Sequence, residues 1–142
     1  MNNENNVQDL QARIDHEADL GAEMLKHKKW AVIGANNNPD KYGNMIFNKL
    51  RSKGYEVYPV NPVYQEVEGE TCYPDLRSLP VLPDVINMVV SPKRGGAFLR
   101  EAAELGIKYI WLQPGTHDDG IMALIDELRL TALQGCVLVA TR

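Results

Sequence analysis

A glycine-punctuated pattern between residues 30 and 62 constrains the fold more than any other feature of the sequence. The apolar run at residues 30–33 stops at a glycine, and a polar loop then leads into a segment whose apolar residues recur every three or four positions. A second glycine ends that segment, and a run rich in β-branched and aromatic residues follows at positions 55–60. The order strand, loop, helix, strand predicts a βαβ unit, whose crossover connection makes the two strands parallel.

Three more short apolar runs follow and alternate with helical patterns, at residues 85–90, 108–112 and 136–139. Strands that alternate with helices predict an α/β domain in which a parallel sheet is covered on both faces. We therefore expect a Rossmann-like, doubly wound sheet of five parallel strands. The expected strand order is 3-2-1-4-5.

The residues before the first strand predict one more helix. Apolar residues recur at steps of three or four between positions 7 and 25, which is typical of an amphipathic helix. We expect this helix to pack on one face of the sheet. The predicted organisation is an N-terminal helical extension, residues 1–29, followed by a ligand-binding Rossmann-like domain, residues 30–142.

Composition and charge restrict the kinds of partner. The net charge is -4, so the chain has no basic footprint for a nucleic acid. No apolar run approaches the length of a membrane span, and the polar start does not resemble a signal peptide. Cys72 and Cys136 lie far apart without metal or redox spacing, which favours a reducing compartment. We expect a cytoplasmic protein that binds a small molecule, with a homodimer or an enzyme partner subunit as further possibilities.

The loop after the first strand carries the strongest functional signal. Gly34 lets the chain turn, and we expect Gly43 to let the backbone approach a ligand where the next helix begins. Three consecutive asparagines tolerate left-handed conformations and supply amide donors and acceptors, and Lys41 adds a cation. Helix N-termini in such loops bind phosphate, which predicts an anionic ligand. The alternative interpretation is a surface turn without a ligand.

The end of the second strand argues against NAD as that ligand. NAD-binding Rossmann proteins place an acidic residue there, where it holds the ribose 2′-hydroxyl. This chain has Asn61 and Pro62 instead. An uncharged residue is compatible with a ligand whose ribose carries a phosphate.

The remaining strand ends add polar residues to the same predicted cleft, because ligands of open parallel sheets bind at the carboxyl ends of the strands. Lys93 and Arg94 stand at the start of a predicted helix, where ligand contact and a solvated pair are equally favoured. His117 is interpreted as a solvated helix start and Cys72 as an unreactive thiol. No carboxylate pair, Cys–His pair or metal cluster is visible in the sequence, which favours a binding protein over an enzyme.

Several segments together resemble a known family, the stand-alone CoA-binding proteins. The same Rossmann-like domain forms the N-terminal part of the succinyl-CoA synthetase α subunit and of ADP-forming acyl-CoA synthetases. The resemblance rests on the segments AVIGAN, YGN, GYEVYPVNP and WLQPG, at residues 31–36, 42–44, 54–62 and 111–115. The chain departs from the family at Asn36, where many members have serine, and at Val63, where many have a basic residue.

The resemblance implies coenzyme A or acyl-CoA as the ligand and assigns a set of contacts. The diphosphate would lie near the glycine loop, the adenosine near the end of the second strand, and the pantetheine arm near the third and fourth strand ends. The implied cofactor-binding residues are Gly34, Ala35, Asn36, Lys41, Tyr42, Gly43, Asn44, Asn61, Pro62, Ser91, Pro92, Gln113, Pro114 and Gly115.

Three functions follow from these observations. The favoured one is a CoA or acyl-CoA binding protein without chemistry of its own, such as a carrier, sensor or accessory subunit. The second is an accessory part of an acyl-CoA synthetase or transferase, whose phosphorylated histidine and nucleotide-activating domain would lie outside this domain. The third is a fragment of an NAD(P)-dependent oxidoreductase, which the loop shape and Asn61 disfavour.

Overall fold

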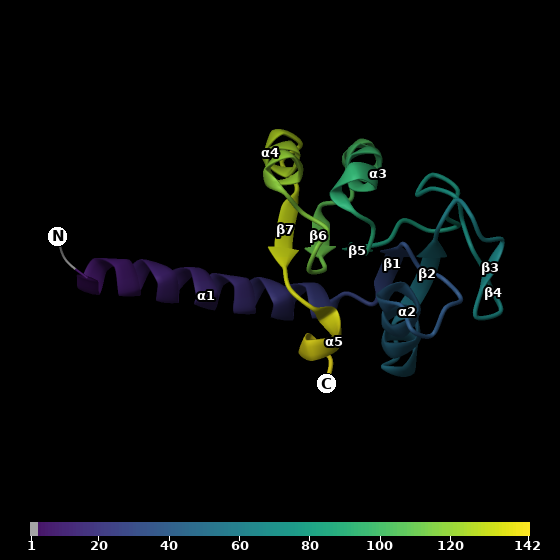
Figure 1. Ribbon diagram of the computed structural model, residues 1–142, viewed down its shortest axis with the longest axis horizontal. Coiled ribbons are helices and arrows are strands. Elements are labelled where there is room, and N and C mark those ends of the chain that lie inside the picture. Colours follow the sequence, from purple (N-terminus) through teal and green to yellow (C-terminus); the bar gives the residue numbers. More distant parts are fainter. Residues whose placement is uncertain (1–2) are drawn as a thin grey trace.

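The computed structural model describes residues 3–142, in which helices cover both faces of a five-stranded parallel sheet (Figure 1). The sheet strands are β1 (Lys29–Ile33), β2 (Glu56–Val60), β5 (Val85–Met88), β6 (Tyr109–Leu112) and β7 (Thr131–Gln134). The helices are α1 (Asn3–Lys26), α2 (Tyr42–Ser52), α3 (Pro92–Leu105), α4 (Asp119–Glu127) and α5 (Val137–Ala140). A small antiparallel hairpin, β3 (Glu66–Val67) and β4 (Glu70–Thr71), lies beyond β2. The predicted Rossmann-like α/β class is confirmed.

The strand order is β2-β1-β5-β6-β7, which is 2-1-3-4-5 along the sheet strands, so the predicted order 3-2-1-4-5 is wrong. The connection from β2 to β5 itself occupies the outer edge of β2, where Tyr73 donates its N–H to the Pro59 carbonyl at 3.0 Å. The third strand therefore pairs with the other side of β1, with Ile33 opposite Met88. All four residues of β5 are buried, as a central strand of a doubly covered sheet requires.

The last strand also differs from the prediction. Residues 131–134 form β7, and the apolar run expected as the fifth strand instead turns into the short helix α5. Val137 of that helix is buried, whereas Val139 is 55% exposed, because one helical turn carries the two side chains to different sides. Cys136, expected to be buried in a strand, is only half-buried.

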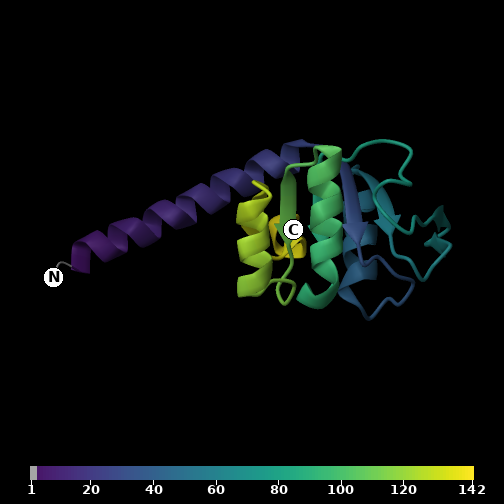
Figure 2. The same cartoon turned by 90° about the horizontal axis from the view of Figure 1, so that it is seen from above.

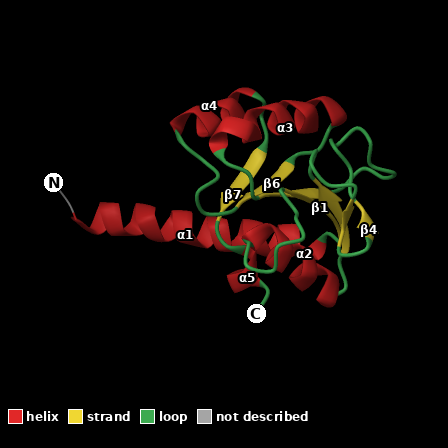
Figure 3. Ribbon diagram, turned by 45° about the vertical axis from the view of Figure 1, so that its right-hand side comes forward, coloured by secondary structure: helices red, strands yellow, loops and turns green. Residues whose placement is uncertain are grey.

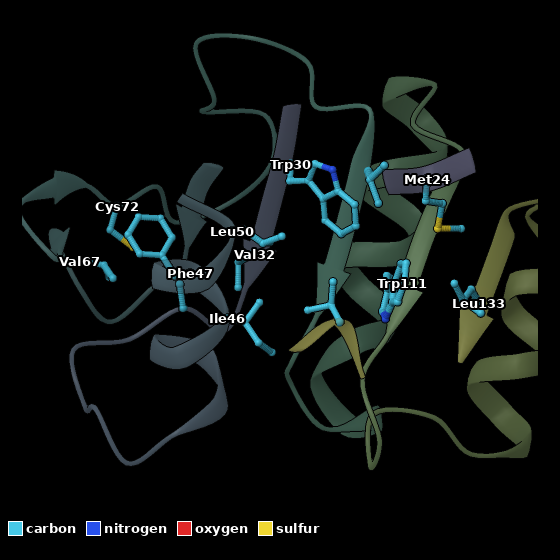
Figure 4. Close-up of a cluster of buried hydrophobic side chains, with 13 residues drawn as sticks. Met24, Trp30, Val32, Ile46, Phe47, Leu50, Val67, Cys72, Trp111 and Leu133 are labelled. Carbon is cyan, nitrogen blue, oxygen red and sulfur yellow. The ribbon is translucent and has the colours of Figure 1, made fainter. Parts of the chain in front are cut away.

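The core has two layers, one on each face of the sheet. Helices α3 and α4 cover one face, and α1, α2 and α5 cover the other (Figure 3). In the second layer Trp30 and Trp111 pack with ring centroids 5.9 Å apart, beside the buried Met24 of α1 (Figure 4). Each indole N–H donates a hydrogen bond to a backbone carbonyl, at 2.8 Å for Trp30 and 2.9 Å for Trp111, as is usual for buried tryptophans.

Helix α1 packs on the sheet only through its C-terminal half. Gly21 brings the helix so close that an added Cβ would lie 3.3 Å from the Leu133 side chain. The N-terminal half extends past β7 (Figure 1) and projects away from the domain (Figure 2). The expectation that this helix packs on the sheet is therefore correct for only half of its length. No helix within residues 3–142 has the length and apolar character needed to cross a bilayer.

Candidate functional site

A cleft opens at the carboxyl ends of β1, β2 and β5, with a volume of ≈ 610 Å³. In strand order 2-1-3-4-5 the chain reverses direction across the sheet between β1 and β5, which is where doubly wound folds bind ligands. The cleft is lined by Gly34, Asn36, Lys41, Tyr42, Gly43, Asn61, Val63, Tyr64, Val89, Val90, Ser91 and Arg94. A second cavity of ≈ 400 Å³ adjoins it and shares Gly34, Asn61, Val63, Val90 and Arg94.

The turn that leaves β1 forms the floor of the cleft. Gly34 has a φ of 101°, the left-handed region that favours glycine, and its N–H donates to the Val60 carbonyl at 2.9 Å. Helix α2 then begins at Tyr42 without a side-chain cap on Lys41, so its leading N–H groups remain available to an anion. The predicted succession of strand, turn and helix is present.

Gly43 has a packing role in addition to the one expected. It lies inside the first turn of α2, and an added Cβ would come within 2.1 Å of the Gly34 carbonyl oxygen. The close approach that requires glycine is therefore between α2 and the chain's own turn. Gly43 therefore sets the position of α2 against the turn, and it also lines the cleft.

Asparagine side chains stabilise the loop after β1 through hydrogen bonds. Asn37 donates to the Glu66 carbonyl at 2.8 Å and accepts from the Glu68 N–H at 2.9 Å, which ties the loop to the β3–β4 hairpin. Asn44 is buried and donates to the Asn36 carbonyl at 2.8 Å. None of the three consecutive asparagines has a positive φ, so the left-handed conformations that the sequence allowed are not used.

The end of β2 is tied to the same loop. Asn61 donates to the carbonyl of the buried Ala35 at 3.0 Å and accepts from the Val63 N–H at 2.9 Å. The amide that replaces the acidic residue of NAD-binding proteins thus bridges two strand ends and still lines the cleft. Pro62 lines the adjoining cavity.

The opposite wall comes from the start of α3. Ser91 is the N-cap residue without a side-chain cap bond, and Pro92 is the first helical residue. Arg94 lines both cavities and Lys93 lines the second, which favours ligand contact over a solvated pair for these cations. The expected site omitted them together with Val63, Tyr64, Val89 and Val90. The signal for the cations was their place at the helix end that disfavours positive charge.

Comparison with known proteins identifies the family. Residues 28–142 match the sequence model of the CoA binding domain. The chain belongs to this family. Helix α1 lies outside the matched residues.

Similar proteins include small stand-alone proteins and parts of larger ligases. A conserved hypothetical protein from Pyrococcus furiosus is 45% identical, with a TM-score of 0.76 over 80% of this chain and 99% of that one. A hypothetical protein from Pyrococcus horikoshii is 32% identical, with a TM-score of 0.77 and 84% of each chain covered. The α subunit of the ADP-forming acetate–CoA ligase II of Pyrococcus furiosus is 39% identical over 79 residues, which are 55% of this chain and 17% of that subunit.

The family segment at the end of β6 does not line the cleft or the adjoining cavity. Gln113 is 3% exposed, and its Oε1 accepts from the Val137 N–H at 2.9 Å and from Asn87 Nδ2 at 3.2 Å. It therefore holds α5 against the sheet. Neither Gln113 nor Pro114 nor Gly115 lines either of the two cavities, so the structure does not bring this predicted part of the site together with the rest.

The thiol of Cys72, which contacts the Asn61 carbonyl beside the cleft, is not activated as a nucleophile. Burial raises the pKa of the Cys72 thiol, and hydrogen bonds with the backbone of Asn61 and Tyr73 offset this only in part. A thiol with a raised pKa stays protonated and unreactive at neutral pH, as the sequence indicated. Within residues 3–142 there is also no group of three or more His, Cys, Asp or Glu side chains that could hold a metal ion.

Proposed function

We propose that the cleft binds coenzyme A or an acyl-CoA, and that residues 30–142 act as a non-catalytic carrier, sensor or accessory domain. The observation that carries this proposal is the pairing of two uncapped helix starts, those of α2 and α3, with the cations Lys41 and Arg94 around one cleft. Two helix N-termini and two cations suit a ligand with several phosphate charges.

The charge of the lining supports an anionic ligand. The whole chain has a net charge of -4, yet the residues that line the two cavities include Lys41, Lys93 and Arg94 and no acidic side chain. Arginine and lysine around a carboxylate-free cavity favour phosphates of the ligand. The absence of an acid at the end of β2 disfavours NAD for a separate reason, because no carboxylate there can hold the ribose 2′-hydroxyl.

The rest of the lining supports a ligand with long apolar parts. Val63, Tyr64, Val89 and Val90 contribute apolar surface to the cleft, and Ala97 and Phe98 extend it into the adjoining cavity. Binding sites of this kind combine apolar walls with a few polar groups that fix orientation. The adenine ring and the pantetheine arm of CoA match such walls.

A binding role is favoured over an enzymatic one by the same residues. The lining of the two cavities contains no carboxylate, histidine or cysteine, so it lacks the carboxylate and imidazole bases and the thiol nucleophile that many enzymes use. Similarity to part of a larger acetate–CoA ligase subunit supports the second candidate, an accessory part of an acyl-CoA synthetase or transferase. In that case the chemistry would belong to a partner subunit.

Titration calorimetry with CoA, acetyl-CoA and NAD tests the proposal. We expect heats of binding for the two CoA compounds and none for NAD. Binding of NAD without binding of either CoA compound would overturn it. Incubation of the pure chain with ATP, CoA and short-chain acids should release no ADP, and robust ADP release would contradict a non-catalytic role.

A further inference from the structure

The projecting half of α1 carries an apolar stripe that no other element covers. Val7, Leu10 and Ile14 follow one another at helical spacing and are 65%, 52% and 51% exposed. Large aliphatic side chains in a continuous exposed row mark an interaction surface in a chain that is otherwise folded around its own core.

An apolar groove continues this stripe. It lies between the C-terminal half of α1 and the segment from β7 to α5, and has a volume of ≈ 560 Å³. On the α1 side, small residues such as Ala18 and Ala22 line it beyond Ile14. Trp111, Leu133 and the 55% exposed Val139 form the other side. None of the groove residues belongs to the proposed ligand cleft.

The surface area of the chain points to a partner of defined size. A compact monomer of 15.9 kDa is expected to expose roughly 7,350 Å² from the size scaling of folded chains. This chain exposes 8250 Å². The excess of roughly 900 Å² is close to the ~800 Å² that each partner contributes to a standard interface. The projecting helix is the feature that departs from a compact shape (Figure 2).

We propose that the groove and the projecting half of α1 bind a second copy of this chain in a two-fold symmetric dimer. The two α1 helices lie antiparallel, and the projecting half of each fills the groove of the other. A two-fold interface uses the same patch on both subunits, so it must be self-complementary. The helix meets this requirement because its projecting half carries large aliphatic residues and its packed half carries small ones.

The antiparallel alignment is centred near Ile14. It places Leu10 opposite Ala18 of the second copy and Val7 opposite Gly21, beside Ala22, so that large side chains meet small ones. The same alignment brings the carboxylate of Asp15 next to Arg13 of the second copy, which adds charge complementarity. Residues 3–14 span about 18 Å at 1.5 Å per residue, long enough to cover the groove. This assembly is independent of the proposed ligand.

Sedimentation equilibrium of the full chain over a range of concentrations tests the dimer. We expect a monomer–dimer equilibrium in which Leu10→Asp or Val139→Asp raises the dissociation constant by at least about tenfold. Leu82→Asp is the matched control, because Leu82 is 53% exposed but lies outside the groove, and it should leave the equilibrium unchanged. Circular dichroism of each variant verifies folding. The two substitutions lie on different elements, Leu10 on the projecting half of α1 and Val139 on α5, so one of them can test the dimer if the other prevents folding.

A wild-type chain that stays monomeric throughout would overturn the proposal and leave the groove to a different partner. If the Leu10→Asp variant folds and still forms the dimer as wild type does, the proposal is overturned as well. Disulfide cross-linking tests the alignment in a Cys136→Ser background. Ile14→Cys should form a covalent dimer readily, whereas Ala12→Cys, on the opposite face of α1, should not. Equal cross-linking of the two variants would contradict the antiparallel arrangement.

Discussion

Gly43 packs against Gly34 so closely that a Cβ at position 43 would lie 2.1 Å from the Gly34 carbonyl oxygen. This contact joins the first turn of α2 to the end of β1, and the cleft lies over it. The distance between helix and turn is therefore set by the absence of a side chain at one position. A substitution at Gly43 affects the fold and the ligand site together.

Gly43→Ala should destabilise the chain by about 2 kcal/mol, because the clash with a backbone carbonyl forces α2 away from the turn. CoA affinity should fall with it. Urea denaturation and calorimetry measure the two effects. Gly135→Ala is the control, since an added Cβ there meets nothing within 4 Å and the φ of Gly135 is not positive. Wild-type stability of Gly43→Ala would show that α2 can shift without cost.

Arg94→Ala should weaken CoA binding by about 1.4 kcal/mol, a factor of ten, if its guanidinium contacts a phosphate. The loss should shrink as salt is raised, because an exposed charge contact is screened. Lys41→Ala should behave in the same way with a smaller effect. Calorimetric titrations at low and high ionic strength measure these losses. Lys53→Ala, at the far end of α2, should bind like wild type. Full affinity in Arg94→Ala would remove this residue from the site.

Asn37→Ala should loosen the loop from residues 34 to 41, because it deletes the hydrogen bonds with the Glu66 carbonyl and the Glu68 N–H. We expect weaker CoA binding with little change in global stability, since the site loses preorganisation and not core contacts. Hydrogen exchange should accelerate in the loop and in the β3–β4 hairpin while α4 serves as the internal reference. Unchanged exchange in the hairpin would mean that these bonds do not hold the loop.

Glu101→Ala should cost about 3 kcal/mol of stability. The Glu101 carboxylate is buried on α3 and accepts from the Leu76 N–H at 2.8 Å and from Arg77 Nη1 at 3.1 Å. Its removal leaves a buried backbone donor unpaired and frees the connection that runs along β2. Glu104→Ala is the matched control, because Glu104 is an exposed partner of the same arginine and should cost at most about 1 kcal/mol. Thermal or urea unfolding measures both variants. Equal losses of stability would show that the burial of Glu101 does not make it more important than Glu104.

The local pattern of the sequence determined the elements that depend on neighbouring residues. The strand, turn and helix around Gly34 follow from apolar runs and glycines, and Gly34 and Gly54 both adopt the positive φ that such turns require. The family segments from residues 31 to 62 placed the cleft at the ends of β1 and β2, as the structure has it. Local steric rules act over a few residues, so they can be inferred from residue type and spacing.

Tertiary structure alone decided the order of the strands and the composition of the cleft wall. The position of β5 beside β1 depends on a long connection that fills the edge of β2, and no local signal encodes that competition. The apolar run after Gly135 is compatible with strand or helix, and burial of Val137 beside Gln113 selects the helix. Gln113 therefore faces the core, whereas Arg94 lines the cleft. Where the local sequence allows more than one structure, contacts between distant segments decide where a side chain points.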